Sequence, residues 1–159
     1  MTILEEALSW ILREEGGYGW DPDDAGGETN FGISKRTYPE VDIKNLTKEK
    51  AKSLYVSDYW NVIKGYALPR RYALALFDAA VRMGPFRAIC LLQGTLEEEV
   101  DGIVGPLTRD ACVKYPNRLD SYLAKCIAFY VRGTSQKFHT GQVMRTLRLR
   151  DLVRDREVQ

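Results

Sequence analysis

Acidic residues are concentrated in one short stretch near the N-terminus, where Glu14 and Glu15 precede a pair of glycines. Three aspartates follow within ten residues: Asp21, Asp23 and Asp24. Hydrolysis of a glycosidic bond requires a carboxylic acid that protonates the leaving oxygen and a carboxylate on the opposite side of the sugar. At the expected end of a helix, the dipole disfavours negative charge and, in a shielded position, favours the protonated form that a general acid needs. The pattern permits a glycosidase site, although solvated glutamates and turn-forming aspartates explain the same residues.

Aromatic side chains near this stretch are candidates for the wall of a sugar-binding cleft. An aromatic face buries the apolar C–H surface of a sugar ring while neighbouring polar groups satisfy the hydroxyls. Packing in the hydrophobic core is the alternative for each of them. The candidates are Tyr18, Trp20, Phe31, Tyr59 and Trp60.

Other catalytic chemistries find little support in the sequence. His139 is the only histidine, and no cysteine or serine nucleophile motif accompanies it, so a catalytic dyad is not expected. The three cysteines, Cys90, Cys112 and Cys126, cannot all pair within one chain and match no zinc-ligand spacing. We therefore expect reduced core thiols, no metal and no cofactor.

The composition is that of one globular unit without a general affinity for polyanions. The chain has 159 residues, and its 23 basic and 22 acidic side chains give a net charge near +1, which provides no argument for nucleic acid or an anionic membrane. Residues 132–159 carry seven basic and three acidic side chains. We expect this segment to be a solvated face, with contact to anionic wall polymers or lipid as the alternative. No run reaches the roughly 18 apolar residues of a membrane span, and residues 1–11 lack the features of a signal peptide.

Helical periodicity and capping motifs predict a mainly α protein. Thr2 and Glu5 can form a capping box before a first helix that Gly16-Gly17 ends. Residues 18–34, rich in glycine and aspartate, favour a small irregular or β-hairpin lobe. Further helices are expected after a cap at Thr47, after Pro69, over 86–93 and 107–114, after a cap at Asn117, and over 138–149.

Two sequence words identify a family resemblance. Residues 11–18 read ILREEGGY and residues 21–34 read DPDDAGGETNFGIS. Together they resemble the start of glycoside hydrolase family 108, N-acetylmuramidases that occur as phage endolysins and in bacterial protein-release systems. The resemblance implies a lysozyme-like helical fold.

The resemblance extends over nearly the whole chain. Residues 75–85 look like the middle helix of the family, and residues 92–93 with 100–108 look like its peptidoglycan-binding-type half. It implies one compact domain, with a catalytic lysozyme-like part at 1–84 and a helical peptidoglycan-binding-type part at 85–159. Three residues depart from the family pattern: Ala25 replaces a frequent proline, Arg82 a usual asparagine and Gln142 a frequent tryptophan.

The family's catalytic acid is carried over to one position. Glu15 matches the glutamate immediately before Gly-Gly-Tyr, and Glu14 does not. Asp24 and Thr29, nine and fourteen residues later, are similar to the Glu, Asp, Thr order of phage-type lysozymes, in which the aspartate and threonine handle the attacking water. Asp21 and Asp23 compete with Asp24 for that role, and shaping a turn is the alternative.

The resemblance implies cleavage of the β-1,4 bond between N-acetylmuramic acid and N-acetylglucosamine. The expected partner is the glycan strand of peptidoglycan, and the expected oligomeric state is a monomer. The enzyme would be made in the cytoplasm and would act on the wall in the periplasm after holin-type or other non-standard export, in cell lysis or protein release. A catalytically silent wall-binding module is the alternative. A nucleic-acid-binding protein has little support, because no DNA-binding motif accompanies the short basic tail.

Overall fold

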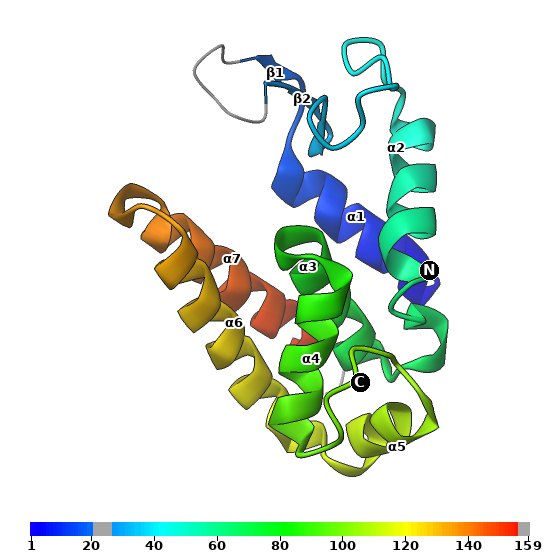
Figure 1. Ribbon diagram of the computed structural model, residues 1–159, viewed down its shortest axis with the longest axis vertical. Helices are drawn as coiled ribbons and strands as arrows, with labels where there is room; N and C mark the ends of the chain where they lie inside the picture. The colour runs from blue at the N-terminus through cyan, green and yellow to red at the C-terminus, as the bar shows by residue number, and fades with distance from the viewer. Residues whose placement is uncertain (21–26, 156–159) are drawn as a thin grey trace.

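The computed structural model describes residues 1–20 and 27–155 and is mainly helical, with one small sheet beside the first helix (Figure 1). The helices are α1 (Ile3–Glu15), α2 (Lys48–Tyr55), α3 (Arg70–Met83), α4 (Pro85–Leu96), α5 (Pro106–Lys114), α6 (Leu119–Gly133) and α7 (Gln136–Arg154). The strands are β1 (Gly19–Trp20), β2 (Glu28–Asn30) and β3 (Ile33–Ser34). A π-helical turn covers Val56–Trp60, and 3-10 turns cover Gly65–Ala67 and Pro116–Arg118. The predicted mainly α class with a small lobe after the first helix is confirmed.

Side-chain caps set the start of two helices as the sequence predicts. The Thr2 hydroxyl accepts a hydrogen bond from the Glu5 backbone at 3.2 Å, and the Glu5 carboxylate accepts one from the Thr2 backbone at 2.7 Å, which completes the capping box. Thr47 caps α2 through the Lys50 backbone. The expected cap at Asn117 is wrong, because this residue lies within a 3-10 turn and α6 begins only at Leu119.

The lobe after α1 is a three-stranded antiparallel sheet in the order β1-β2-β3, drawn at the top of Figure 1. Gly19 pairs with Thr29, and Asn30 pairs with Ile33. The buried side-chain amide of Asn30 donates a hydrogen bond to the Ile43 carbonyl at 3.1 Å. This bond ties the sheet to the segment that leads into α2.

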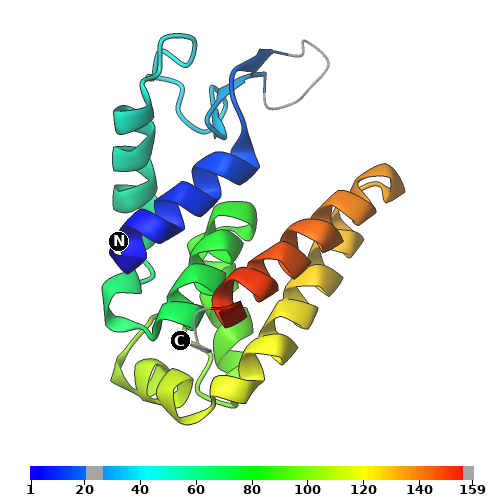
Figure 2. The same cartoon turned by 180° about the vertical axis from the view of Figure 1, so that it is seen from behind.

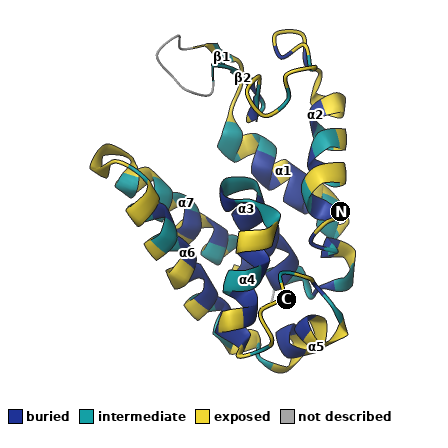
Figure 3. Cartoon of the chain, viewed as in Figure 1, coloured by how far each residue is buried: buried dark blue, intermediate teal, exposed yellow. Residues whose placement is uncertain are grey.

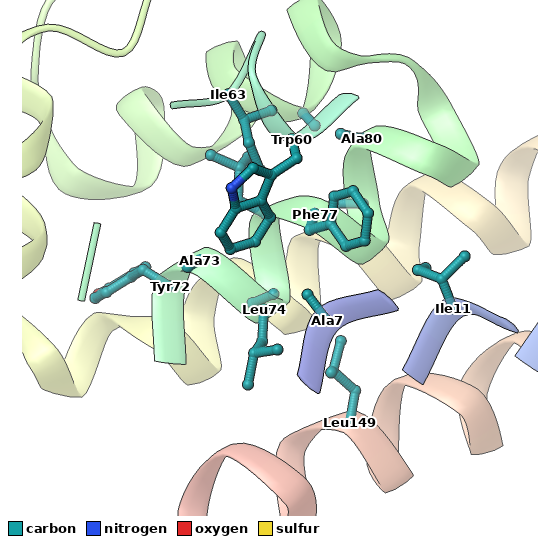
Figure 4. Close-up of a cluster of buried hydrophobic side chains, with 14 of the residues drawn as sticks. Ala7, Ile11, Trp60, Ile63, Tyr72, Ala73, Leu74, Phe77, Ala80 and Leu149 are labelled. Atoms are coloured by element: carbon teal, nitrogen blue, oxygen red, sulfur yellow. The ribbon is translucent and has the colours of Figure 1, made fainter. Parts of the chain in front are cut away.

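The hydrophobic core is organised around α3, of which ten of the 14 residues are buried. This helix packs against α1, α4 and α7, and its dark buried surface contrasts with the exposed outer faces of α5 and α6 (Figure 3). Figure 4 shows Trp60, Phe77 and Leu149 converging from three segments on the same cluster. Residues from both ends of the chain therefore share one core.

The C-terminal helices α6 and α7 lie side by side as a hairpin, and α7 also packs on α3 (Figure 2). Since α1 packs on α3 as well, the basic side chains of α7 come close to the acidic end of α1. This arrangement, and not the sequence around Glu15 alone, determines the environment of the candidate acid.

Candidate active site

A cavity of about 590 Å³ opens where the lobe, the end of α2, the α3–α4 junction and the α6–α7 hairpin meet. This volume lies within the usual range of ligand sites. Its lining residues are Glu15, Gly32, Thr37, Tyr55, Tyr59, Val81, Arg82, Arg87, Phe129, Tyr130, Gly133, Thr134, Gln142 and Arg145. Among the described residues that line it, Glu15 is the only carboxylate.

Glu15 is the last residue of α1, and Gly16 ends the helix with a φ of +75°. The Glu15 side chain is 22% exposed, so it is shielded yet accessible from the cavity. Its Oε1 accepts a hydrogen bond from Arg145 Nη1 at 2.7 Å. Oε2 accepts no hydrogen bond from the part of the chain that the structure describes.

Glu14 has a different environment. Its side chain is 9% exposed and accepts a hydrogen bond from Arg148 at 2.6 Å, and it does not line the cavity. The geometry thus separates the two adjacent glutamates, and Glu15, the residue that the family resemblance selects, is the one that faces open space.

Arg145 is held in place by Asp78 of α3. Its Nε donates to Asp78 Oδ1 at 2.9 Å, and Trp10 of α1 donates its indole N–H to the same oxygen at 2.9 Å. Asp78 is 2% exposed, and a buried carboxylate is retained only with such partners. Burial opposes the charge of Arg145, but the two carboxylates outweigh that penalty and raise the pKa of its guanidinium above the usual value.

Sequence reasoning missed both Asp78 and Arg145. The prediction of a solvated basic face holds for Arg148, Arg150 and Arg154, whose side chains are 50%, 38% and 52% exposed and pair with Glu14 and Asp120. It is wrong for Arg145, which is largely buried. The available signal was Asp78 itself, an acid among the apolar residues of a core-facing helix, which requires a buried donor.

Arg82 and Gln142, two of the residues that depart from the family pattern, contact each other. Arg82 donates to the Gln142 side-chain oxygen, to Thr146 at 3.2 Å and to Asp78 at 3.1 Å. Its guanidinium lies 3.5 Å from the centroid of the Tyr130 ring. The two departures therefore form one polar contact between α3 and α7 on the cavity wall.

The lobe contacts Glu15 through a tight turn. Phe31 and Gly32 both have positive φ, and a Cβ on Gly32 would lie 2.7 Å from the Glu15 side chain and 2.5 Å from Tyr55 Oη. Tyr55 donates its hydroxyl to the Phe31 carbonyl at 2.7 Å, and burial raises the pKa of this phenol. The backbone thus approaches the candidate acid as closely as glycine allows.

The five aromatic candidates separate into three groups. Tyr59 lines the cavity, whereas Tyr18 and Trp20 are exposed on the lobe, where Tyr18 donates to Glu28 at 3.0 Å. Phe31 packs on the core. Trp60 is 3% exposed and meets Phe77 edge-on at 5.4 Å, so the expectation of a cleft position for it is corrected to core packing.

Of the remaining catalytic candidates, Thr29 alone lies among the described residues, and it does not join Glu15 at the cavity. Thr29 lies in β2, donates its hydroxyl to the Gly19 carbonyl at 3.3 Å and does not line the cavity. Asp21, Asp23 and Asp24 lie outside the described residues.

The motif at residues 101–108 forms a tightly bonded turn. The Gln93 amide donates to Asp101 at 2.7 Å and to Thr108 at 3.1 Å, while its oxygen accepts from the Gly102 backbone at 2.9 Å. The hydrogen bond from Gln93 lowers the pKa of Asp101. The hydrogen bonds of the turn explain why Asp101, Gly102 and Thr108 occupy these positions. Ile103 and Leu107, beside them, are exposed.

In the described part of the chain, the histidine and the cysteines form no catalytic or metal-binding arrangement. No three His, Cys, Asp or Glu side chains there are grouped to hold a metal ion. All three cysteines are free, and His139 contacts the Thr134 carbonyl at 3.0 Å. Within residues 1–20 and 27–155 no helix has both the length and the apolarity to cross a bilayer.

Comparisons with known proteins agree with the sequence motifs at residues 11–18 and 21–34 and with the fold. Residues 8–84 match the family described as glycosyl hydrolase 108. A solved structure of Brucella abortus SagA is 31% identical, with 94% of this chain and 92% of that chain covered and a TM-score of 0.84. No curated protein matches the chain. The family match covers the segment that carries Glu15, and the likeness to the solved relative covers both halves; this chain belongs to glycosyl hydrolase family 108.

Proposed function

We propose that this glycosidase is an N-acetylmuramidase, a lysozyme, that cuts the β-1,4 bond between N-acetylmuramic acid and N-acetylglucosamine in peptidoglycan. One observation carries the proposal: Glu15, at the position of the family's catalytic acid, is the one described carboxylate that lines the 590 Å³ cavity. Family membership supports a peptidoglycan hydrolase.

Glu15 acts as the general acid in this proposal. Its protonated carboxyl donates a proton to the glycosidic oxygen as the bond from that oxygen to the anomeric carbon breaks. Arg145 holds Oε1, and Oε2 is available to carry the proton. Water then adds to the anomeric carbon; one of its protons stays on the new hydroxyl group, and the other passes to a carboxylate.

Asp24 is the proposed second carboxylate, and Thr29 is proposed to help position the attacking water. An ionised Asp24 would stabilise the oxocarbenium-like transition state or deprotonate water. Tyr59 is the proposed aromatic contact for a sugar ring within the cavity, and Tyr18 and Trp20 on the lobe would meet more distant sugars of the strand.

The proposed setting is the bacterial wall. We place the enzyme in the periplasm, after holin-type or other non-standard export, where it would serve lysis or the release of a large protein. The division into a catalytic part at 1–84 and a peptidoglycan-binding-type part at 85–159 belongs to the same proposal.

The turbidity of a Gram-negative wall suspension tests the proposal. Wild-type protein is expected to clear the suspension and Glu15→Gln is not, because an amide keeps the shape of the side chain but cannot donate the proton. Glu14→Gln is the matched control, since its side chain does not line the cavity, and most activity should remain. Melting temperatures verify that both variants are folded. A wild type that sediments with walls without clearing them would support the silent binding module instead.

A further inference from the structure

The cavity carries more positive than negative charge among its described lining residues. Three arginines line it, Arg82, Arg87 and Arg145, against the single carboxylate of Glu15. Arg82 and Arg145 are neutralised by Asp78 and Glu15. Arg87 forms no ion pair with any residue that the structure describes. Among the described residues that line the cavity, Arg87 is therefore the one cation without a carboxylate partner.

Arg87 is supported on an aromatic ring. Its guanidinium carbon lies 5.0 Å from the centroid of the Phe129 ring, and Phe129 also lines the cavity. Stacking on a ring restricts the guanidinium while its N–H groups remain available, which favours bidentate binding of a carboxylate.

The position of Arg87 along the chain adds to the positive potential. It is the third residue of α4, a helix of 12 residues whose first turn contains no acid. The unsatisfied backbone N–H groups and the dipole of a helix N-terminus attract anions. The Arg87 guanidinium and the N-terminus of α4 thus favour the same kind of ligand, an anion.

We propose that Arg87 is a specificity residue that binds a carboxylate on the muramoyl side of the substrate. This inference rests on the proposed muramidase function. N-acetylglucosamine is neutral, whereas N-acetylmuramic acid has a lactyl group whose carboxylate is either free or linked to a stem peptide with carboxylates of its own. Binding of either carboxylate by Arg87 makes the enzyme prefer muramoyl glycans over neutral ones.

Four soluble substrates test the proposal and distinguish the two sources of the carboxylate. Uncross-linked glycan strands are prepared with stem peptides and, after amidase treatment, without them; half of each preparation is then converted to the neutral methylamides. The value of kcat/KM is measured on all four for wild type, Arg87→Gln, Arg87→Lys and the control Arg109→Gln. Arg109 is an exposed arginine of α5 outside the cavity, where it pairs with Asp110 at 3.1 Å.

Wild type and Arg109→Gln are expected to lose about tenfold in kcat/KM on methylamidation, a typical value for one charge-assisted contact. Arg87→Gln should cut charged and neutral strands at equal rates, near the wild-type rate on neutral strands, and Arg87→Lys should retain part of the preference. If methylamidation lowers the kcat/KM of wild type only on peptide-bearing strands, Arg87 binds the stem carboxylate. If it lowers kcat/KM on peptide-free strands, Arg87 binds the lactyl carboxylate.

Two results would overturn the inference alone: equal rates of wild type on charged and neutral strands, or an equal loss of preference in Arg87→Gln and Arg109→Gln. A wild type that cuts none of the four substrates would overturn the proposed function as well, so the two failures are distinct.

Discussion

Glu15 of α1 accepts a 2.7 Å hydrogen bond from Arg145 of α7, a residue 130 positions further along the chain. The family match ends at residue 84, so the partner of the candidate acid comes from the second half of the chain. A fragment that ends at residue 84 would lack this guanidinium and the α7 surface that packs on α3.

Removal of Arg145 is expected to cost both stability and activity. Arg145→Ala leaves Glu15 without its donor and Asp78 with one cation fewer, and breaking a buried ion pair typically costs about 3 kcal/mol. Arg145→Lys keeps the charge but cannot reach two carboxylates with a rigid fork, so an intermediate loss is expected. Urea denaturation measures the free energy of unfolding, and a change below about 1 kcal/mol in Arg145→Ala would contradict the network described here.

Substitution of Gly32 tests the close approach of the lobe to Glu15. A Cβ there would meet Tyr55 Oη at 2.5 Å and the Glu15 side chain at 2.7 Å, at a φ of +76°. Gly32→Ala should therefore lower the free energy of unfolding by about 3 kcal/mol and displace the candidate acid, with loss of wall clearing.

Gly27→Ala is the matched control for backbone strain. Gly27 has a φ of +65°, but a Cβ there would meet no described residue within 4 Å, so only about 1 kcal/mol is expected from the positive φ. Thermal melting of the two variants compares the costs. An equal loss of stability in Gly32→Ala and Gly27→Ala would contradict the close contact between Gly32 and Glu15.

Substitution of Asp24 tests the second carboxylate. If an ionised Asp24 activates water or stabilises the transition state, Asp24→Asn lowers kcat at least about a hundredfold, or roughly 2.7 kcal/mol in the barrier, with little change in binding to walls. If Asp24 only shapes a turn, the amide of Asp24→Asn can make similar backbone hydrogen bonds, and activity should be preserved. Asp21→Asn and Asp23→Asn control for the charge of the loop, and a larger defect in either would move the role to that residue.

Alkaline pH is expected to destabilise the fold through two buried thiols. Burial raises the pKa of Cys112 and of Cys126 to about 12, while thiols of the unfolded chain ionise near pH 8.5. Below about pH 8.5 both states keep the proton; above it the unfolded state alone ionises, so stability falls as pH rises toward 12. Urea denaturation at pH 7 and pH 9, where tyrosines of the unfolded chain with a pKa near 10 stay mostly protonated, checks the direction, and iodoacetamide at pH 8 should label neither thiol in the folded protein.

Much of the scaffold was predictable from local signals. The Thr2–Glu5 capping box, the Thr47 cap and the glycines after Glu15 are short-range motifs, and the structure confirms all three. Asn117 failed as a cap because Pro116 begins a 3-10 turn that moves the N-cap of α6 by one residue, to Arg118.

The surroundings of the site were not predictable from local signals. The hydrogen bond between Asp78 and Arg145 joins residues 67 positions apart, and spacing carries no information on a contact set by helix packing. Trp60 shows the same limit, since an aromatic residue at the end of a helix fits a cleft or a core equally well until its contact with Phe77 is known. Glu15 could be distinguished from Glu14 by sequence, because the Gly-Gly-Tyr motif of the family directly follows Glu15.

Analysis of the cleavage products tests the central claim most directly. Purified peptidoglycan is digested with wild type and with Glu15→Gln, the new reducing ends are labelled with borohydride, and the fragments are identified by mass spectrometry. The proposed mechanism predicts muropeptides that end in reduced N-acetylmuramic acid from wild type and none from Glu15→Gln. New free peptide amines on intact glycan, or the same muropeptides from Glu15→Gln, would contradict the assignment of Glu15 as the acid of a muramidase.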